Sequence, residues 1–401
     1  MASKAAEDIT ENEYDCFAEE TFTSPYEEFR RMRRECPVAH STDFGGFWMV
    51  TRYEDVVSML SDGENYITSI RNIVPSSSST ARTPPLHFDP PQHTPYRKAL
   101  ERALSKGRVS KLTPAVQRHA ETLMDEFAAR GGGDFAQSIA TRLPVLSIGE
   151  WIGLTDEQAD RLWKLNCAYT RAWVAFDKDT VMQCVDGFNE ITKEILADRG
   201  ENLRDPEIDP PSSLMTTVLP DGNKIPPDIL HGAIRQSLVI GLAAPPMVLG
   251  SMVTYLAKNP DLFRQLRAQP ELLPAALEEF LRLFTPYRGF ARTSRTEVEI
   301  HGRKIRPKEA IAMSFASANR DETVFADPDT FKLDRPNISR HIAFGLGPHR
   351  CAGMPIARVV LGAALKAMTQ RWSSVEMDGE PVVTSMPEIG PIKVPLKVTP
   401  A

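Results

Sequence analysis

The sequence predicts a mainly α-helical fold with small β-sheets, and three observations support this prediction. Amphipathic helical periodicity recurs along most of the chain, in residues 26–35, 54–60, 113–130, 143–153, 156–173, 181–197 and 229–258. Strand-like composition is confined to short stretches, at residues 47–51, 298–311 and 380–399. The 32 prolines cluster in turns that separate helices. Because no clear linker divides the chain, we expect a loose N-terminal arm over residues 1–24 and one domain over residues 25–401.

The composition of this 401-residue chain, with 42% hydrophobic and 25% charged residues, is typical of a soluble globular protein. Its net charge of −6 argues against a nucleic-acid-binding protein, which is usually basic. Residues 1–23 are acidic and polar, unlike a signal or transit peptide, and no apolar run reaches the length of a membrane span. We therefore expect a soluble, cytoplasmic protein that binds neither nucleic acid nor membrane.

The cysteines argue for a reducing compartment. There are five, which is an odd number, and they are widely scattered: Cys16, Cys36, Cys167, Cys184 and Cys351. That distribution is not a disulfide framework, and no CxxC pair indicates a zinc site.

One glycine-rich stretch, Phe344–Arg358, stands out near the C-terminus. Three glycines within nine residues disfavour both helix and strand, so the stretch before residue 354 is predicted to be a tight loop. A helical apolar stripe begins directly afterwards, which places Cys351 at the last bend before a helix N-terminus. Because the free N–H groups there favour an anion, we expect the Cys351 thiol to titrate early as a thiolate. A thiolate on such a loop suits a cysteine-ligated haem iron, although an isolated cysteine at this place would more often be structural.

The residues of this loop resemble the haem-binding loop of the cytochrome P-450 family. Phe344, Gly347, His349, Cys351 and Gly353 fall at the family's positions. The resemblance extends from about residue 29 to residue 396. It implies the cytochrome P-450 fold, with haem b held between a long distal helix and the proximal cysteine loop. It also implies that Cys351 is the axial iron ligand and that Phe344 and Gly353 contact the haem.

Further residues match the family's contacts with the haem propionates. His93 and Arg97 are four residues apart and share one face of a predicted helix. Two isolated basic side chains on a helix are usually solvated. The resemblance nevertheless implies that both residues, together with Arg292 and His349, bind the propionates. Two cations that face one ligand require an anionic ligand, which the propionates supply.

Glu279 and Arg282 form the family's E-x-x-R pair. Three residues apart on a helix, they can form an ion pair, and such a pair is commonly found on the surface. The segments that follow, including Asn319 and Arg335, resemble the family's buried network that braces the cysteine loop. We therefore expect a structural role for this pair.

The distal helix departs from the family pattern. At the places of Ala243 and Ala244 the family carries an acidic residue and a threonine, which deliver protons during dioxygen activation. Neither alanine can donate a proton. Pro245 and Pro246 are expected to break the helix and to leave the carbonyls of Gly241 and Leu242 without helical partners. Gly241, Ala243 and Ala244 are thus the predicted catalytic segment. Two outcomes stay open: water replaces the alcohol, or the freed carbonyls bind a polar group and oxygen activation is substrate-assisted or unnecessary.

The resemblance also suggests which residues contact the substrate. Ile70, Ile73, Ile240, Ala244 and Phe290 are the candidates. Trp173 is a further candidate for the pocket wall, and the turn at residues 386–390 is expected beside it. Arg71 and Arg288 are candidate anchors for a substrate carboxylate.

Three functions remain in competition. The first is a haem-thiolate monooxygenase that oxidises a small organic molecule in secondary or catabolic metabolism. The second is haem-thiolate chemistry without dioxygen, driven by peroxide, by an N–O-activated substrate or by rearrangement. The third is a haem-based sensor. The first requires electrons from a separate ferredoxin and reductase or from a flavoprotein, which could dock on a basic patch formed by Arg102, Lys106, Arg108, Lys111, Arg350 and Arg358.

Overall fold

The computed structural model describes residues 12–23, 25–75, 84–239, 241–384 and 387–401. Its α-helices are α1 (Glu19–Thr23), α2 (Pro25–Glu35), α3 (Tyr53–Ser61), α4 (His93–Ala103), α5 (Lys106–Val109), α6 (Thr113–Ala129), α7 (Arg142–Ile152), α8 (Asp156–Val174), α9 (Lys178–Glu201), α10 (Pro210–Thr216), α11 (Pro227–Val239), α12 (Ala244–Lys258), α13 (Pro260–Ala268), α14 (Leu273–Leu283), α15 (Phe315–Ala318) and α16 (Met354–Arg371). Its strands are β1 (Val38–Ser41), β2 (Phe47–Val50), β3 (Tyr66–Ile67), β4 (Gly132–Asp134), β5 (Phe290–Ser294), β6 (Val298–Ile300), β7 (Arg303–Ile305), β8 (Ala310–Met313), β9 (Trp372–Met377), β10 (Val382–Val383), β11 (Pro391–Lys393) and β12 (Pro395–Pro400).

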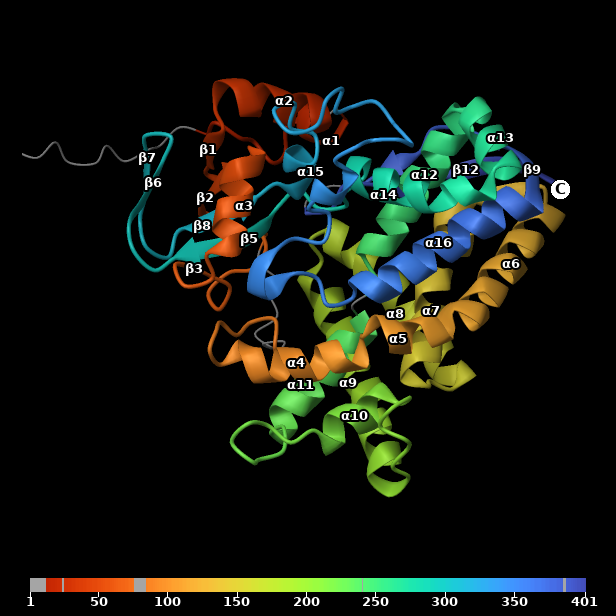
Figure 1. Cartoon of the computed structure of the whole chain (residues 1–401), viewed down its shortest axis with the longest axis horizontal. Coiled ribbons are helices and arrows are strands. Elements are labelled where there is room, and N and C mark those ends of the chain that lie inside the picture. The colour runs from red at the N-terminus through yellow and green to blue at the C-terminus, as the bar shows by residue number, and fades with distance from the viewer. Residues whose placement is uncertain (1–11, 24, 76–83, 240, 385–386) are drawn as a thin grey trace, which may run out of the picture.

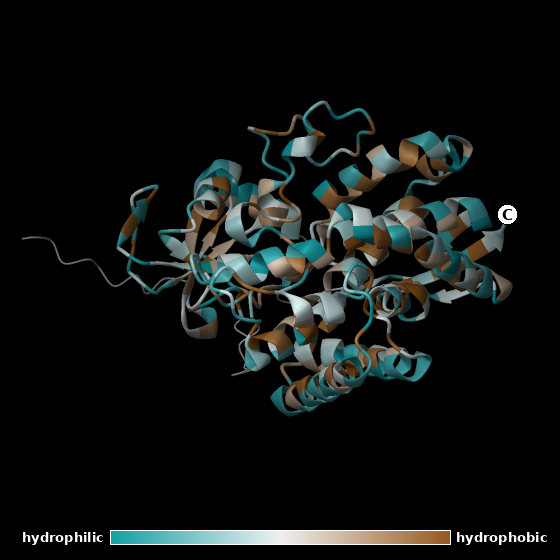
Figure 2. Cartoon of the chain, turned by 60° about the horizontal axis from the view of Figure 1, so that its bottom comes forward, coloured by the Kyte–Doolittle hydropathy of each residue, from teal (hydrophilic) through white to brown (hydrophobic). Residues whose placement is uncertain are grey.

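The elements separate into a sheet-rich end and a helical end. The sheet β1-β2-β8-β5-β3 lies at one end together with α2 and α3, and the helices α6, α12, α14 and α16 fill the other (Figure 1). Within this sheet only β2 and β8 pair in parallel. The helical end holds the larger hydrophobic core. Hydrophobic residues alternate with hydrophilic ones around the helices, as expected for elements that each bury one side (Figure 2).

The predicted helices and strands are confirmed in most places. Every helix predicted upstream of residue 200 has a counterpart within a few residues, and the strand-like stretch at 47–51 forms β2. The N-terminal segment differs from the expected loose arm. Tyr14, Cys16 and Thr21 are buried against the domain, because the burial of these side chains outweighs the entropy of ordering the segment. Residues 1–11 and 24 lie outside the described residues.

The predicted distal helix over 229–258 is two helices. α11 ends at Val239 and α12 begins at Ala244, so Pro245 and Pro246 lie in the first turn of a new helix, where no N–H group is needed. The stretch Pro227–Lys258 is long and apolar enough to span a membrane, but 65% of its most apolar window is buried inside the protein. We therefore assign it to the protein core.

A buried ion network joins α14 to the loop that follows α15. The Glu279 and Arg282 side chains are both 0% exposed and lie 2.7 Å apart. Arg335 donates hydrogen bonds of 2.9–3.1 Å to the same carboxylate. The Arg282 guanidinium also donates to the backbone carbonyl of Asn319, and the Asn319 side chain accepts from the amide of Ile342, two residues before Phe344. The predicted brace behind the cysteine loop is thus confirmed.

Glu279→Ala is expected to lower the free energy of unfolding by about 3–5 kcal/mol, because it leaves two buried guanidinium groups without their carboxylate. These hydrogen bonds hold the pKa of Glu279 below its ordinary value, although burial alone would raise it. The contribution of Glu279 to the free energy of unfolding is therefore present above its unfolded-state pKa and is lost as the pH falls through its folded-state pKa.

Chemical denaturation of the mutant and the parent measures this loss. Asp261→Ala is the matched control, since it removes an exposed carboxylate paired with Arg264 and should cost only about 0–1 kcal/mol. Equal effects of the two substitutions would contradict a bracing role for Glu279.

Candidate functional site

The cysteine loop is shaped by two glycines with left-handed backbone. Gly345 and Gly347 both have φ of 67°, which costs little only for glycine. A Cβ on Gly347 would lie 2.0 Å from the Leu60 carbonyl oxygen, so no side chain fits there. The Cys351 amide donates to the Phe344 carbonyl at 2.8 Å and closes the loop. These contacts fix Cys351 immediately before α16, as the sequence predicted.

The Cys351 thiol does not have the low pKa that the sequence suggested. Burial raises its pKa, and the amides of Gly353 and Met354, together with the charges of Arg97 and Arg358, only partly offset this effect. The Cys351 residue is nevertheless exposed. Because a bound metal ion deprotonates a coordinating thiol, iron itself would supply the charge that favours the thiolate.

The predicted propionate-binding residues come together beside this loop. The rings of His93 and His349 lie 4.3 Å apart at their centroids, and both side chains are buried. Burial lowers the pKa of both imidazoles, and the charge of Arg97 lowers them further. Asp89 lies 3.8 Å from Nε2 of His349 and opposes this effect.

Arg97 and Arg292 complete the group from two different elements. Arg97 on α4 pairs with Glu101 at 2.9 Å and also donates to the carbonyl of Arg350 in the cysteine loop. Arg292 on β5 is 6% exposed, and its side chain donates to the Ala291 carbonyl at 2.9 Å. Among the described residues, no carboxylate lies within ion-pair distance of Arg292. Burial accordingly lowers the pKa of Arg292 to about 10.

These residues fit a haem with its two propionates. Nδ1 of His349 is buried and lacks a hydrogen-bond partner within the described part of the chain, and a buried polar atom of this kind requires one. Arg292 likewise lacks a counter-charge. A carboxylate placed between them would satisfy both groups. The amides of Gly353 and Met354, which lower the Cys351 pKa, are suitably placed to stabilise a sulfur ligand.

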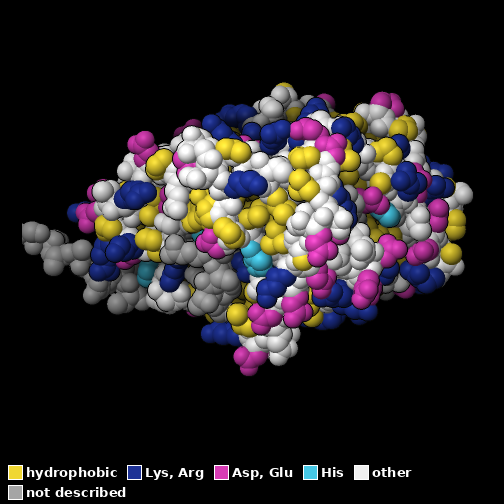
Figure 3. Space-filling view, turned by 90° about the horizontal axis from the view of Figure 1, so that it is seen from below, with side chains coloured by type: hydrophobic (Ala, Val, Ile, Leu, Met, Phe, Trp, Pro, Cys, Tyr) yellow, Lys and Arg dark blue, Asp and Glu magenta, His cyan; other side chains and the backbone are white. Residues whose placement is uncertain are grey.

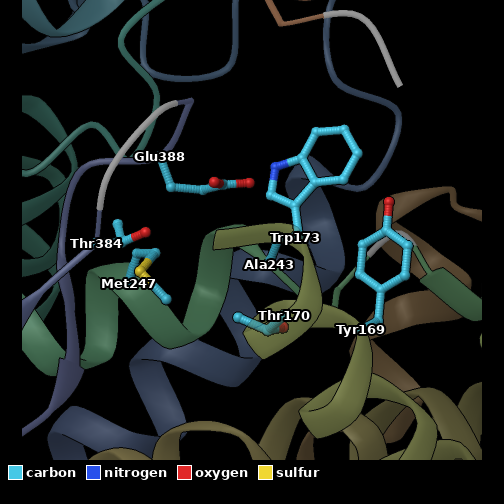
Figure 4. Close-up of a pocket in the computed structure, with 7 residues that line it drawn as sticks. All are labelled: Tyr169, Thr170, Trp173, Ala243, Met247, Thr384 and Glu388. Carbon is cyan, nitrogen blue, oxygen red and sulfur yellow. The ribbon is translucent and has the colours of Figure 1, made fainter. Parts of the chain in front are cut away.

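A pocket lies where α8, α12 and the C-terminal segment meet (Figure 4). Its lining comprises Tyr169, Thr170, Trp173, Ala243, Met247, Thr384 and Glu388. The predicted catalytic segment thus contributes Ala243, which presents a methyl group to the pocket. Gly241 packs near Ile148 and Pro144 instead.

The carbonyl of Leu242 has a partner that the sequence did not reveal. Asn166 on α8 donates to it from Nδ2 at 3.2 Å, and both residues are buried. The break between α11 and α12 is therefore compensated inside the protein at this position. This carbonyl already accepts a hydrogen bond, unlike the unpaired group that the sequence suggested.

The tentative substrate residues lie in several places. Ala244 follows Ala243 at the start of α12, and Ile73 forms an isolated bridge with Phe290. Phe290 packs against Tyr287, with ring centroids 4.6 Å apart. Ile70 is 48% exposed. None of these four lines the pocket around Ala243, and Ile240 lies outside the described residues.

Sequence reasoning predicted that Trp173 and the turn at 386–390 form parts of the pocket; Trp173 and Glu388 line it, residue 386 lies outside the described residues, and Glu388 was not predicted as an individual residue. Tyr169, Thr170, Met247 and Thr384 were missed as well. Their helical or strand-like neighbourhoods carry no local signal, because the lining is assembled from segments more than 130 residues apart in the sequence, between Ala243 and Thr384. The candidate anchor Arg288 points elsewhere: it donates to the carbonyl of Thr21.

Comparisons with known proteins indicate the family and the fold. Residues 177–399 match the family described as Cytochrome P450. The mycinamicin IV hydroxylase/epoxidase of Micromonospora griseorubida is 32% identical and covers 82% of this chain and 83% of its own length. The steroid C26-monooxygenase of Mycolicibacterium smegmatis is 29% identical, and the match covers 94% of this chain and 93% of that protein. The solved structure of cytochrome P450 CYP109Q5 from Chondromyces apiculatus has a TM-score of 0.85, at 26% identity, over 97% of this chain and 98% of that one.

Arg292→Leu is expected to accelerate haem loss, because the side chain has no role in any ion pair within the described protein and its charge is available to a propionate. Hydrogen bonds to charged groups are worth about 1.5–3 kcal/mol each, so haem release should be about ten- to a hundredfold faster. Transfer of haem to an acceptor protein measures the rate.

Arg295→Leu serves as the control, since Arg295 is an exposed neighbour that donates to the Glu64 carbonyl. Arg97→Leu should also accelerate release. Unchanged haem release from both the Arg97 and Arg292 variants would exclude the propionate assignment.

Proposed function

Because this chain belongs to the cytochrome P450 family, we propose that it oxidises a small organic molecule through haem b ligated by Cys351. It is an oxidoreductase of the monooxygenase type. The observation that best supports the residue assignment is the buried, positively charged group beside the cysteine loop, in which Arg292 lacks a carboxylate among the described residues. This group would hold the propionates of a haem, and Cys351 would supply the sulfur ligand.

Each predicted cofactor residue has a separate role in this proposal. Bound haem, with its thiolate ligand, supplies the chemistry that activates dioxygen and inserts an oxygen atom. Cys351 provides the sulfur, and the amides of Gly353 and Met354 stabilise its charge. Phe344 closes the loop through its carbonyl. The propionates are held by His93, Arg97, Arg292 and His349.

The segment Gly241–Ala244 contributes shape to the reaction and carries no side-chain proton donor. Ala243 is a wall of the pocket, and Ala244 begins α12 next to it. Gly241 packs closely against Ile148, where a Cβ would lie 3.4 Å from a side-chain carbon. Protons must therefore come from water, from another pocket residue or from the substrate.

This absence of a donor supports a second candidate function. Haem-thiolate chemistry driven by peroxide, by an N–O-activated substrate or by rearrangement does not require protons to be delivered to dioxygen. Ala243 and Ala244 are compatible with such chemistry. The product and the source of its oxygen atom would decide between the two functions.

Electrons for dioxygen activation are proposed to come from a separate ferredoxin or flavoprotein in the cytoplasm. Of the six residues predicted to form a basic docking patch, Arg102 and Arg108 pair with Glu207, and Arg358 pairs with Glu278 at 2.6 Å. Lys106, Lys111 and Arg350 are exposed. On the face seen in Figure 3, basic and acidic side chains are interspersed rather than separated. A docking site would therefore rest mainly on Lys106, Lys111 and Arg350.

Cys351→Ala is expected to abolish the thiolate-type spectrum of the carbon monoxide complex, because the stretch 344–358 has no other cysteine. The folded protein should persist, since the backbone contact of Cys351 with Phe344 does not involve the side chain. Absorption spectroscopy of the reduced carbon monoxide complex measures the change, and circular dichroism verifies the fold. Cys36→Ala, at a half-buried cysteine, should keep the spectrum. Retention of the spectrum by the Cys351 variant would identify another ligand.

Turnover of a generic hydrophobic substrate is expected to be poorly coupled, because neither Ala243 in the pocket wall nor the adjacent Ala244 can deliver a proton. Ala244→Thr should fail to restore coupling, since position 244 begins α12 directly before two prolines and its hydroxyl would be misplaced. Product formed per electron consumed, with isotopically labelled dioxygen, measures coupling. Efficient oxygenation by the parent protein, with no dependence on a hydroxyl or amine in the substrate, would contradict substrate-assisted proton supply.

A further inference from the structure

The pocket beside Ala243 contains one carboxylic acid, Glu388. Its side chain extends from the C-terminal segment across the pocket toward Trp173 (Figure 4). The facing wall is aromatic: the rings of Tyr169 and Trp173 are stacked with centroids 5.8 Å apart and an interplanar angle of 11°. Met247 and Ala243 supply apolar surface on the α12 side.

Glu388 has no counter-ion. Within the described residues, its carboxylate forms no ion pair and no side-chain hydrogen bond with another residue. Burial raises the pKa of Glu388 to about 7, although the charge of Arg288 and a backbone hydrogen bond act in the opposite direction. Within the described residues Arg288 forms no ion pair with Glu388, and its guanidinium donates to the Thr21 carbonyl in the N-terminal segment.

The absence of a partner distinguishes Glu388 from the structural acids of this protein. Glu278 and Glu279 are each held by two basic side chains, whereas Glu388 faces the pocket alone. A buried charge without a partner is costly, so such a group is retained where it serves a ligand or a reaction. An aromatic wall next to a carboxylate is a combination that favours cations, since both the charge and the ring faces attract them.

We propose that this pocket binds a substrate that carries a protonated amine, with the ammonium group held between the Glu388 carboxylate and the Trp173 ring. The apolar part of the substrate then lies over Met247 and Ala243, toward the site assigned to the haem. This inference rests on the proposed function and adds the substrate class to it.

The charge of the pocket is opposite to the one expected from the sequence. Arg71 and Arg288 were candidate anchors for a substrate carboxylate, but neither lines this pocket. A carboxylate ligand would instead be repelled by Glu388. A protonated amine also brings protons to a pocket in which Ala243 and Met247, on the α12 side, are not proton donors. This is compatible with substrate-assisted proton supply.

The affinity for a cation should depend on pH. The titratable groups that face Glu388 are Tyr169, Tyr287 and Arg288. Burial raises the pKa of Tyr169 to about 12 and that of Tyr287 well above its ordinary value, and Arg288 stays charged, so none of them titrates near neutrality. An alkylamine, with a pKa near the value of about 10.4 for lysine, stays protonated there. Cation binding should therefore strengthen between about pH 6 and about pH 8, as Glu388, with its pKa of about 7, loses its proton.

The test compares ligands of similar shape and different charge on the haem-loaded protein. The probes are N,N-dimethylphenylbutylamine, its N-trimethyl ammonium analogue, phenylbutanol and phenylbutanoate. The quaternary ammonium has no lone pair and cannot coordinate iron, so it separates recognition by the pocket from ligation by nitrogen. Dissociation constants come from haem spectral titrations, with equilibrium dialysis as an independent measurement.

Both cationic probes are expected to bind more tightly than the alcohol at about pH 8, and the carboxylate more weakly than either. Glu388→Gln should weaken cation binding by about ten- to a hundredfold, the range for losing one charged contact. It should leave alcohol binding unchanged and abolish the pH dependence. Glu388→Asp keeps the charge and should retain part of the preference. Glu380→Gln, at an exposed glutamate of the same C-terminal segment, is the matched control and should behave like the parent.

Equal affinity of the parent protein for the alcohol and the cations would overturn the proposal, as would an unchanged cation preference in Glu388→Gln. Failure of all four probes to bind would also count against it. In each case the carbon monoxide spectrum reports separately on the proposed function. A thiolate-type spectrum without cation preference refutes only the substrate class, whereas a spectrum independent of Cys351 refutes the haem-thiolate assignment itself.

Discussion

The placement of the site depends on one buried carboxylate, Glu279, which is shared by Arg282 and Arg335. The two arginines come from segments more than 50 residues apart, and each also donates to backbone carbonyls of the loop around residues 326–330. A buried charge is stable only when a partner of opposite charge lies at hydrogen-bonding distance. The contacts of Glu279 with the two arginines therefore hold α14 in a fixed position against the loop. Through Asn319, the same network reaches the amide of Ile342, directly before the cysteine loop. The position of Cys351 is thus set partly by contacts outside its own loop.

The neighbouring glutamate extends this brace to the helix after the cysteine. Glu278 accepts hydrogen bonds from Arg358 on α16 at 2.6 and 2.8 Å and contacts His341 at 2.9 Å. Burial alone would raise the pKa of Glu278, but these partners lower it to about 2, so it stays charged at all ordinary pH values. Two adjacent acids on α14 therefore hold the two ends of the cysteine loop. The loop itself is shaped by its glycines and by backbone hydrogen bonds, among them those from Gly345 to Ile342, from Arg350 to Gly347 and from Cys351 to Phe344.

The parts of the site that the sequence predicted are those encoded locally. The sequence predicts the glycine spacing around Cys351 because it lies within one loop. It predicts the pairing of His93 and Arg97 because they lie within about one helical turn. The partner of Leu242 was not predictable, since Asn166 lies on a different helix and is an ordinary polar residue in its own context. The pKa of Cys351 was predicted in the wrong direction. The prediction considered the N–H groups at the helix N-terminus, which lower the pKa, but not the burial of the thiol, which raises it by more.

Glu388 shows the same limit of sequence reasoning in functional terms. In the sequence it is one of many acidic residues, and only the folded chain surrounds it with the aromatic wall of α8 and the apolar start of α12. Arg288 acts on Glu388 through its charge, but its guanidinium donates to the Thr21 carbonyl in the N-terminal segment. The two charged edges of the site then have opposite signs: a group of basic side chains suited to the propionates, and a carboxylate at the substrate pocket. A ligand that extends from the proposed haem site toward α8 would meet negative charge at its far end, while Ala243 and Met247 offer it only apolar surface. Under the proposed function, α12 would offer the substrate apolar contact through Met247, whereas recognition of its charge and the supply of protons would fall to groups outside α12.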